Sequence, residues 1–194
     1  MRLLRFIYKK GVGALFWLAV MLAFDSPFIC ILTLIAAAIH ECGHIIAARA
    51  LGRRDTGAPR ATLDGFKIDT GATLPYRDEA IIAAAGPLCN LLAALVSLPF
   101  CHSGYALTFL LINLLSALSN LLPLTSYDGG RIIGALLRSR LDEHRAASVT
   151  DAISLVLSFL LSLLTLMLIM YLGEGYWLFG MFFAIFLREI LKKH

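Results

Sequence analysis

The chain has 194 residues, of which 59% are hydrophobic and only 15% are charged, and its mean hydropathy is +0.81. Because soluble domains carry about 25% charged residues, this composition excludes a soluble globular protein and indicates an integral membrane protein. The formal net charge is +4. In a membrane protein such an excess of basic residues indicates which side of the membrane the loops face and where anionic lipids are contacted. We therefore expect no nucleic-acid partner.

Uncharged apolar runs divide the chain into about six segments, each long enough for a helix that crosses a hydrocarbon layer of ~30 Å. They cover roughly residues 6–24, 27–51, 80–101, 104–122, 151–172 and 175–191. All 17 Lys and Arg lie on one side of this arrangement. The positive-inside rule therefore predicts an all-α polytopic membrane protein with both termini in the cytoplasm.

The second expected span contains the run His40-Glu41-Cys42-Gly43-His44, which follows the uncharged residues 28–39. Side chains four positions apart share one face of a helix, so the two imidazoles can bind one zinc ion. Glu41 lies one position further round and can reach a water at the metal, as a general base must. The run predicts a zinc metallohydrolase. Because this span runs inward, we expect the site nearer the cytoplasmic side of the membrane.

The most polar part of the chain, residues 52–79, lies between the second and third spans. Within it, Asp64-Gly65 separates two short β-prone runs, which predicts a small β-hairpin. An ordinary cytoplasmic loop is the alternative. A strand edge at this place could accept an extended substrate segment.

Asn90 lies in the third span and Asn120 at the end of the fourth. An amide side chain can donate a hydrogen bond to a scissile carbonyl or to the oxyanion that develops from it. Hydrogen bonding between neighbouring helices is the other interpretation of both residues.

The fourth span closes with Asn120-Leu-Leu-Pro, and Asp128-Gly129-Gly130 follows shortly after. Proline cannot donate a helical hydrogen bond and glycine relaxes the backbone, so we expect an unwound segment from Pro123 to Gly130. Asp128 would emerge from this segment at the same leaflet as the histidines and can supply a third, oxygen ligand. An ordinary helix-end turn is the alternative for Asp128 alone.

Two glutamates compete with Asp128 as the third ligand, namely Glu174 and Glu189. The expected topology puts Glu174 on the outer side, away from the histidines. Glu189 lies on the correct side, but its basic neighbours predict a solvated helix end. We therefore favour Asp128. Residues 131–149 mix apolar and basic side chains at helical spacing, which predicts an interfacial helix, with a solvated linker as the alternative.

Three motifs, taken in order, resemble the site-2 protease family of intramembrane zinc metalloproteases. They are His40-Glu-x-x-His44, then Gly86-Pro87-Leu-Cys-Asn90, then Asn120-Leu-Leu-Pro with Asp128-Gly-Gly. The match covers the second to fourth spans, and the layout is similar to the sporulation proteases that process a pro-sigma factor. The resemblance implies one zinc ion held by His40, His44 and Asp128, with Glu41 as the base. It also favours the hairpin and a prokaryotic cell membrane.

The resemblance further implies a membrane-anchored protein substrate, such as a tethered sigma or anti-sigma factor. We expect a single transmembrane metalloprotease domain over residues 1–194, with a catalytic core at about 27–130, no PDZ domain and no nucleotide-sensing domain after the last span. Control would then fall to a separate regulatory membrane protein. The alternative function is a catalytically silent receptor or a metal transporter that keeps the zinc-binding core. A transporter would carry ionisable groups in both leaflets, and a silent relative would lose Glu41 before its histidines.

Overall fold

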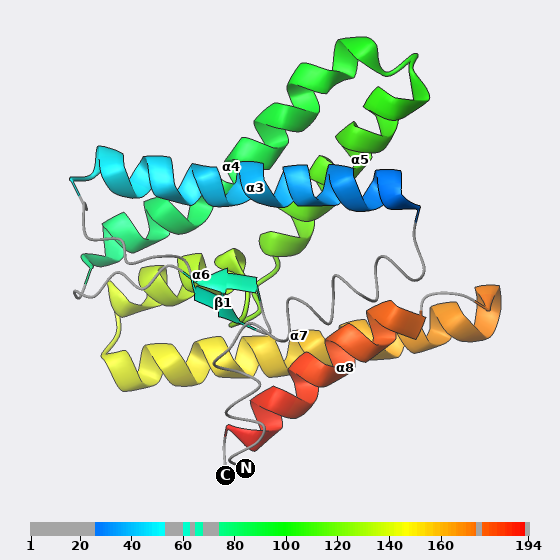
Figure 1. The fold of residues 1–194 in the computed structure, drawn as a ribbon. Helices are drawn as coiled ribbons and strands as arrows, with labels where there is room; N and C mark the ends of the chain where they lie inside the picture. Colours follow the sequence, from blue (N-terminus) through cyan, green and yellow to red (C-terminus); the bar gives the residue numbers. More distant parts are fainter. Residues whose placement is uncertain (1–25, 53–59, 63–64, 68–73, 174–175, 193–194) are drawn as a thin grey trace. The chain divides into compact units, whose positions relative to one another are not determined.

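The computed structural model describes residues 26–52, 60–62, 65–67, 74–173 and 176–192. In this part of the chain it contains helices and one two-stranded sheet, labelled as in Figure 1. The chain forms two compact units, Met1–Asn120 and Leu121–His194. The first unit contains α3 (Pro27–Ala50), β1 (Arg60–Thr62), β2 (Gly65–Lys67), α4 (Tyr76–Ser97), the 3-10 turn η1 (Leu98–Phe100) and α5 (Gly104–Asn120). The second contains α6 (Asp128–Arg138), α7 (Glu143–Leu172) and α8 (Tyr176–Leu191).

Helix α3 begins where local chemistry favours a helix start. The Ser26 hydroxyl accepts a hydrogen bond from the Ile29 amide at 3.3 Å, and Pro27 occupies the first helical position, where its missing N–H costs nothing. The helix packs closely on α4 because Gly43 carries no side chain. A Cβ atom at Gly43 would lie 2.6 Å from the carbonyl oxygen of Ala85.

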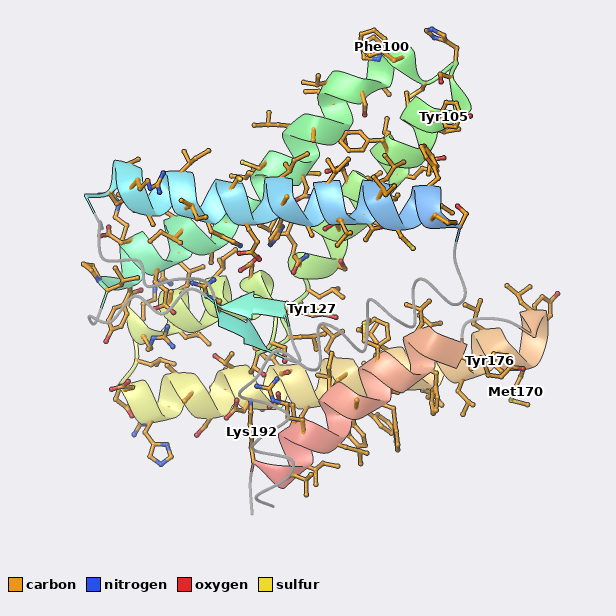
Figure 2. All side chains as sticks on the ribbon, viewed as in Figure 1. Phe100, Tyr105, Tyr127, Met170, Tyr176 and Lys192 are labelled. Carbon is orange, nitrogen blue, oxygen red and sulfur yellow. The ribbon has the colours of Figure 1, made fainter. Side chains whose placement is uncertain are left out.

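Helices α4 and α5 form a hairpin, and both also pack on α3. Phe100 and Tyr105 lie near the tip of this hairpin (Figure 2). The Tyr105 ring meets the Phe28 ring edge-on, with centroids 4.9 Å apart. The start of α5 thus packs on the start of α3. The three helices α3, α4 and α5 thus form the framework on which the histidines are presented.

The two short strands pair in antiparallel fashion, with Ala61 opposite Phe66 and Thr62 opposite Gly65. They lie where the hairpin was expected. The register corrects one detail, because Gly65 belongs to β2 and pairs with Thr62 instead of forming the turn. Residues 63–64, which include Asp64, lie outside the described residues.

In the second unit, α8 packs along α7, and α6 packs on α7. Helix α7 begins at the Asp142 side chain, which accepts a hydrogen bond from the Arg145 amide, and it ends at Gly173, whose φ of 72° only glycine adopts readily. Small hydroxyl residues occupy the buried positions along the helix: Thr150, Ser154, Ser158, Ser162 and Thr165. Such residues let helices approach closely in lipid.

Three of the expected spans correspond to helices that are long and apolar enough to cross a membrane: Pro27–Ala50, Tyr76–Phe100 and Glu143–Leu172. They identify the chain as an integral membrane protein. The expected span 6–24 lies outside the described residues, whereas α5 and α8 have only 17 and 16 residues. At about 1.5 Å per residue they fall short of a ~30 Å hydrocarbon layer, so six spans are not shown.

Several expected boundaries are wrong, because charged residues begin helices as well as interrupt spans. Helix α4 begins four residues before the expected residue 80, since Asp78 and Glu79 are favourable in a first turn. The expected interfacial helix 131–149 is in fact two elements. Helix α6 ends at Arg138, and the Asp142 cap starts α7.

Candidate metal centre

Helix α3 places His40 and His44 on one buried face, with 7% and 5% of each residue exposed. The Nε2 atoms of the two imidazoles face each other at 3.1 Å, and the ring centroids lie 4.7 Å apart. The spacing of four residues therefore brings both side chains together, as the sequence predicted.

The second nitrogen of each imidazole bonds to a carbonyl oxygen. His40 Nδ1 lies 3.0 Å from Asn90 Oδ1, and His44 Nδ1 lies 2.7 Å from the backbone oxygen of Ile82. Because a carbonyl oxygen only accepts, both Nδ1 atoms must carry the proton and donate. Each Nε2 atom is then left with a lone pair, which is the form in which histidine binds a metal.

Two nitrogen lone pairs that face each other at 3.1 Å repel unless a cation lies between them. A tetrahedral zinc ion with Zn–N bonds of about 2.0–2.1 Å holds two nitrogens roughly 3.3–3.4 Å apart. The observed distance is close to this value. The donor set and its geometry therefore fit a zinc ion.

Asn90 is fully buried, and its amide oxygen and both amide hydrogens make hydrogen bonds within the first unit. Its Oδ1 accepts from His40, and its Nδ2 donates to the carbonyl of Ala36 and to Asn113 Oδ1, both at 3.1 Å. These contacts are the helix-to-helix bonds of the second interpretation. Asn90 therefore orients His40 and has no amide hydrogen left for an oxyanion.

Asn113 belongs to the site although the sequence did not single it out. It is fully buried in α5, accepts from Asn90, and donates through Nδ2 to the carbonyl of Phe109 at 2.9 Å. The amide chain from His40 to Asn113 thus ties α3, α4 and α5 together. The available signal was an amide in the middle of an apolar span, the same signal that drew attention to Asn90.

Gly86 supplies the room that the two imidazoles occupy. A Cβ atom at this position would lie 2.5 Å from the Cε1 and Nε2 atoms of His44 and 2.8 Å from His40 Nε2. The backbone of α4 at Gly86 therefore packs directly against the Nε2 atoms of both histidines. Glycine is required here for space, since the position lies inside a regular helix.

Glu41 and Asn120, the expected base and oxyanion donor, also lie in the first unit. Glu41 follows His40 on α3 and is partly buried, and one of its carboxylate oxygens is shielded from solvent. Asn120 ends α5, and its Nδ2 donates to the carbonyl of Ser116 at 2.9 Å, which uses one of two amide hydrogens. Their roles in chemistry stay predictions.

Asp128, the expected third ligand, lies in the second unit at the start of α6. It is 6% exposed, and Arg131 Nη1 donates to its Oδ1 at 3.1 Å. The positive end of the helix dipole and the guanidinium both stabilise its carboxylate. Since the histidines belong to the other unit, their sharing of a metal with Asp128 stays a prediction.

The segment before Asp128 is non-helical over residues 121–127, but Gly129 and Gly130 are helical, which corrects the expected unwound stretch 123–130. A Cβ atom at Gly129 would collide with the carbonyls of Leu121 and Leu122, and one at Gly130 with the carbonyl of Leu124. The glycines therefore let α6 begin against the backbone of the preceding segment. They do not serve to unwind it.

The expectation of a solvated Glu189 is wrong. This residue is 2% exposed, and Lys192 Nζ donates to both of its carboxylate oxygens, at 3.0 Å and 2.9 Å. A basic neighbour one helical turn away predicts a solvent-facing carboxylate in the sequence, but in the fold it neutralises a buried charge. Glu174 lies outside the described residues.

No model of a known protein family matches the chain. Among curated proteins, the chain is similar to a zinc metalloprotease of Methanocaldococcus jannaschii, with 28% identity over 162 aligned positions. The match covers 77% of this chain and 47% of the relative. The chain thus spans about half the length of that relative.

Among solved structures, the chain is similar to the site-2 protease from Methanocaldococcus jannaschii. The TM-score is 0.68 at 20% sequence identity, and the match covers 94% of this chain and 87% of that chain. The chain therefore has the fold of that protease. The resemblance drawn from the motifs is confirmed, while its sporulation-type layout is not tested.

Proposed function

We propose that this chain is an intramembrane zinc metalloendopeptidase that hydrolyses peptide bonds in or near the membrane-spanning segment of tethered regulatory proteins. The observation that carries the proposal is the pair of imidazole Nε2 atoms that face each other at 3.1 Å while each Nδ1 atom is bonded to a carbonyl oxygen. The zinc metalloprotease relative and the site-2 protease fold support the same activity.

His40, His44 and Asp128 are proposed to be the side chains that would hold one zinc ion. When bound, zinc acidifies a water and polarises the peptide carbonyl, which makes hydrolysis possible near neutral pH. The chain's own contribution is orientation. Asn90 and Ile82 keep the two imidazoles in the ligating tautomer, and Gly86 leaves them the room they need.

Glu41 is proposed to accept the proton of the attacking water and to pass it to the nitrogen of the departing amine. Its place beside His40 on α3 supports this role, because a carboxylate next to a metal ligand can reach a water at that site. Asn120 is proposed to donate its second amide hydrogen to the scissile carbonyl oxygen. Asn90 acts through His40 and does not touch substrate.

The substrates are proposed to be membrane-anchored proteins such as sigma or anti-sigma factors, cleaved on the cytoplasmic side of a prokaryotic cell membrane. The one-sided placement of all 17 Lys and Arg supports this orientation. The paired strands β1 and β2 offer an edge for an extended peptide, which matters because a helical peptide hides its amides. A separate membrane protein is proposed to regulate access.

The test compares wild type with Glu41→Gln and His40→Ala, each purified in detergent and also co-expressed with single-span transcription-factor precursors. We expect about one zinc per chain in wild type and in Glu41→Gln, since Glu41 is not a proposed ligand, and loss of zinc from His40→Ala. We expect a shortened precursor with wild type alone. Metal analysis and immunoblotting of the precursor give the two readouts.

Two results would overturn the assignment. Equal loss of zinc from Glu41→Gln and His40→Ala would make Glu41 a ligand and leave the site without a base. Zinc in wild type and Glu41→Gln but not in His40→Ala, together with no cleavage of any precursor by wild type, would favour the silent receptor or the transporter.

A further inference from the structure

The segment 121–127, which leads into Asp128, packs on α8 through apolar side chains. Leu124 is fully buried against Phe182 and Ile185 of α8. Tyr127 donates its hydroxyl hydrogen to the sulfur of Met181 at 3.5 Å. These contacts hold the non-helical segment within the second unit, together with its own turn, in which the Tyr127 amide donates to the carbonyl of Leu124 at 2.9 Å.

Polar groups hold the same segment at Thr125. Its hydroxyl donates to Glu189 Oε1 and accepts from Lys192 Nζ at 3.1 Å, and its amide donates to Ser154 Oγ at 3.1 Å. The next residue, Ser126, accepts from Arg188 Nη1 at 2.6 Å. Both the backbone and the side chain of Thr125 are thus fastened to α7 and to the last turn of α8. We call Thr125, Ser154, Glu189 and Lys192 the α8 clamp.

Glu189 is buried although it lies near the end of α8, where a charged side chain is usually exposed to solvent. Its side chain is 1% exposed, whereas that of Lys192 is 36% exposed and also lies 3.7 Å from Asp151 Oδ1. A buried carboxylate is tolerated only where hydrogen bonds and a counter-charge replace the lost water. Here the replacement comes from Lys192 and from Thr125, so the charge is oriented toward the segment 121–127.

A rigid connection runs from the α8 clamp to the start of α6. Thr125 precedes Asp128 by three positions in the sequence. Gly129 and Gly130 lie against the carbonyls of Leu121, Leu122 and Leu124, so α6 cannot shift unless the segment shifts with it. The place of the Asp128 carboxylate therefore depends on where the segment is held.

We propose that the α8 clamp is a positioning device for the third metal ligand, with Glu189 and Thr125 as its central pair. The carboxyl end of α8, where Figure 2 labels Lys192, thereby belongs to the metal centre without touching metal or substrate. The inference rests on the proposed function, in which Asp128 is that ligand. Partners that orient a ligand typically change metal affinity by roughly 10–100-fold when removed.

The experiment loads the purified full chain with Co²⁺, whose visible absorption reports the number and geometry of its ligands. Thr125→Val keeps the shape of the side chain and removes the hydroxyl. We expect it to weaken Co²⁺ binding by roughly 10–100-fold and to shift the spectrum toward that of Asp128→Asn. Thr125→Ser restores the hydroxyl and should restore both affinity and spectrum. Glu189→Gln keeps an acceptor for Thr125, so its Co²⁺ affinity should fall only about a few-fold.

Thr165→Val is the matched control, because Thr165 is also buried in the second unit but donates only to carbonyls within α7. It should bind Co²⁺ as wild type does. Melting of each metal-free variant shows whether it is folded; if Thr125→Val is not, Glu189→Gln and Glu189→Ala carry the comparison with Thr125→Ser.

The outcomes separate two failures. If wild type binds no Co²⁺, or Asp128→Asn binds it like wild type, the proposed third ligand is wrong. If Asp128→Asn weakens binding but folded Thr125→Val and Glu189→Ala match wild type in affinity and spectrum, the positioning role of the α8 clamp is wrong.

Discussion

At the scale of single residues, the metal centre depends on side chains that never meet the metal. Asn90, which is itself hydrogen-bonded to Asn113, fixes the orientation of His40. The backbone carbonyl of Ile82 fixes the orientation of His44. Neutral donors and acceptors suit a buried site, because each bond is strong at low dielectric and no further charge must be desolvated. Gly86 contributes only the absence of a side chain.

The role of Gly86 predicts a large effect from one methyl group. Gly86→Ala would put a Cβ atom 2.5 Å from His44 Nε2, so we expect metal affinity to fall at least about tenfold while the helix stays intact. Gly180→Ala is the matched control, since Gly180 also lies inside a helix and an added methyl group there would meet nothing within 4 Å. The control should stabilise α8 by roughly 0.5–1 kcal/mol.

Zinc titration and thermal melting measure both glycine variants. A Gly86→Ala protein that bound zinc like wild type would show that the imidazoles adopt another arrangement when the metal is present.

At the scale of elements, α7 associates with its neighbours through small hydroxyl residues spaced about one turn apart. Thr150, Ser154 and Ser158 are buried. A Thr or Ser hydroxyl can donate a hydrogen bond to a carbonyl of its own helix, as Thr150 does to the carbonyl of Ala146 at 2.8 Å. Lipid is as apolar as leucine, so burying large apolar side chains brings little gain here. Close approach of helices is what stabilises the second unit.

Ser158→Leu tests this packing. Ser158 is fully buried, so leucine would overpack the helix interface and should destabilise the unit by about 1–3 kcal/mol. Val156→Leu, at a position on the same helix that is 58% exposed, should leave the melting temperature unchanged. Thermal unfolding in detergent decides; equal effects of the two variants would mean that the buried side of α7 is not its packing face.

At the scale of the whole molecule, large apolar side chains face outward along the long helices. Leu92 on α4, Leu115 on α5 and Met170 on α7 are 59%, 63% and 81% exposed, which suits a chain surrounded by lipid. The basic residues then decide which ends of these helices face the cytoplasm.

The orientation predicts opposite labelling of two exposed serines. In a variant without the four native cysteines, Ser103→Cys, between α4 and α5, should react with an impermeant maleimide added to intact cells. Ser139→Cys, between α6 and α7, should react only after lysis, because it lies among the basic residues. External labelling of Ser139→Cys would reverse the orientation and exclude the release of cytoplasmic products.

The sequence by itself determined what depends on neighbours along the chain. The apolar run predicted a span at 27–51 that the structure has at Pro27–Ala50, and the spacing of four placed His40 beside His44. Both follow from helix geometry, which repeats every few residues. The resemblance to site-2 proteases came from motifs of the same local kind.

Only the tertiary structure decided which distant groups meet. Asn90 accepts from a residue 50 positions away, Gly86 lies beneath imidazoles from another helix, and Glu189 is buried by a threonine 64 positions before it. Burial and hydrogen-bond pairing depend on packing between elements, which the local composition of the chain does not predict. A carboxylate beside lysines therefore looks solvated in the sequence, although in the fold Lys192 is the partly exposed counter-charge of the buried Glu189.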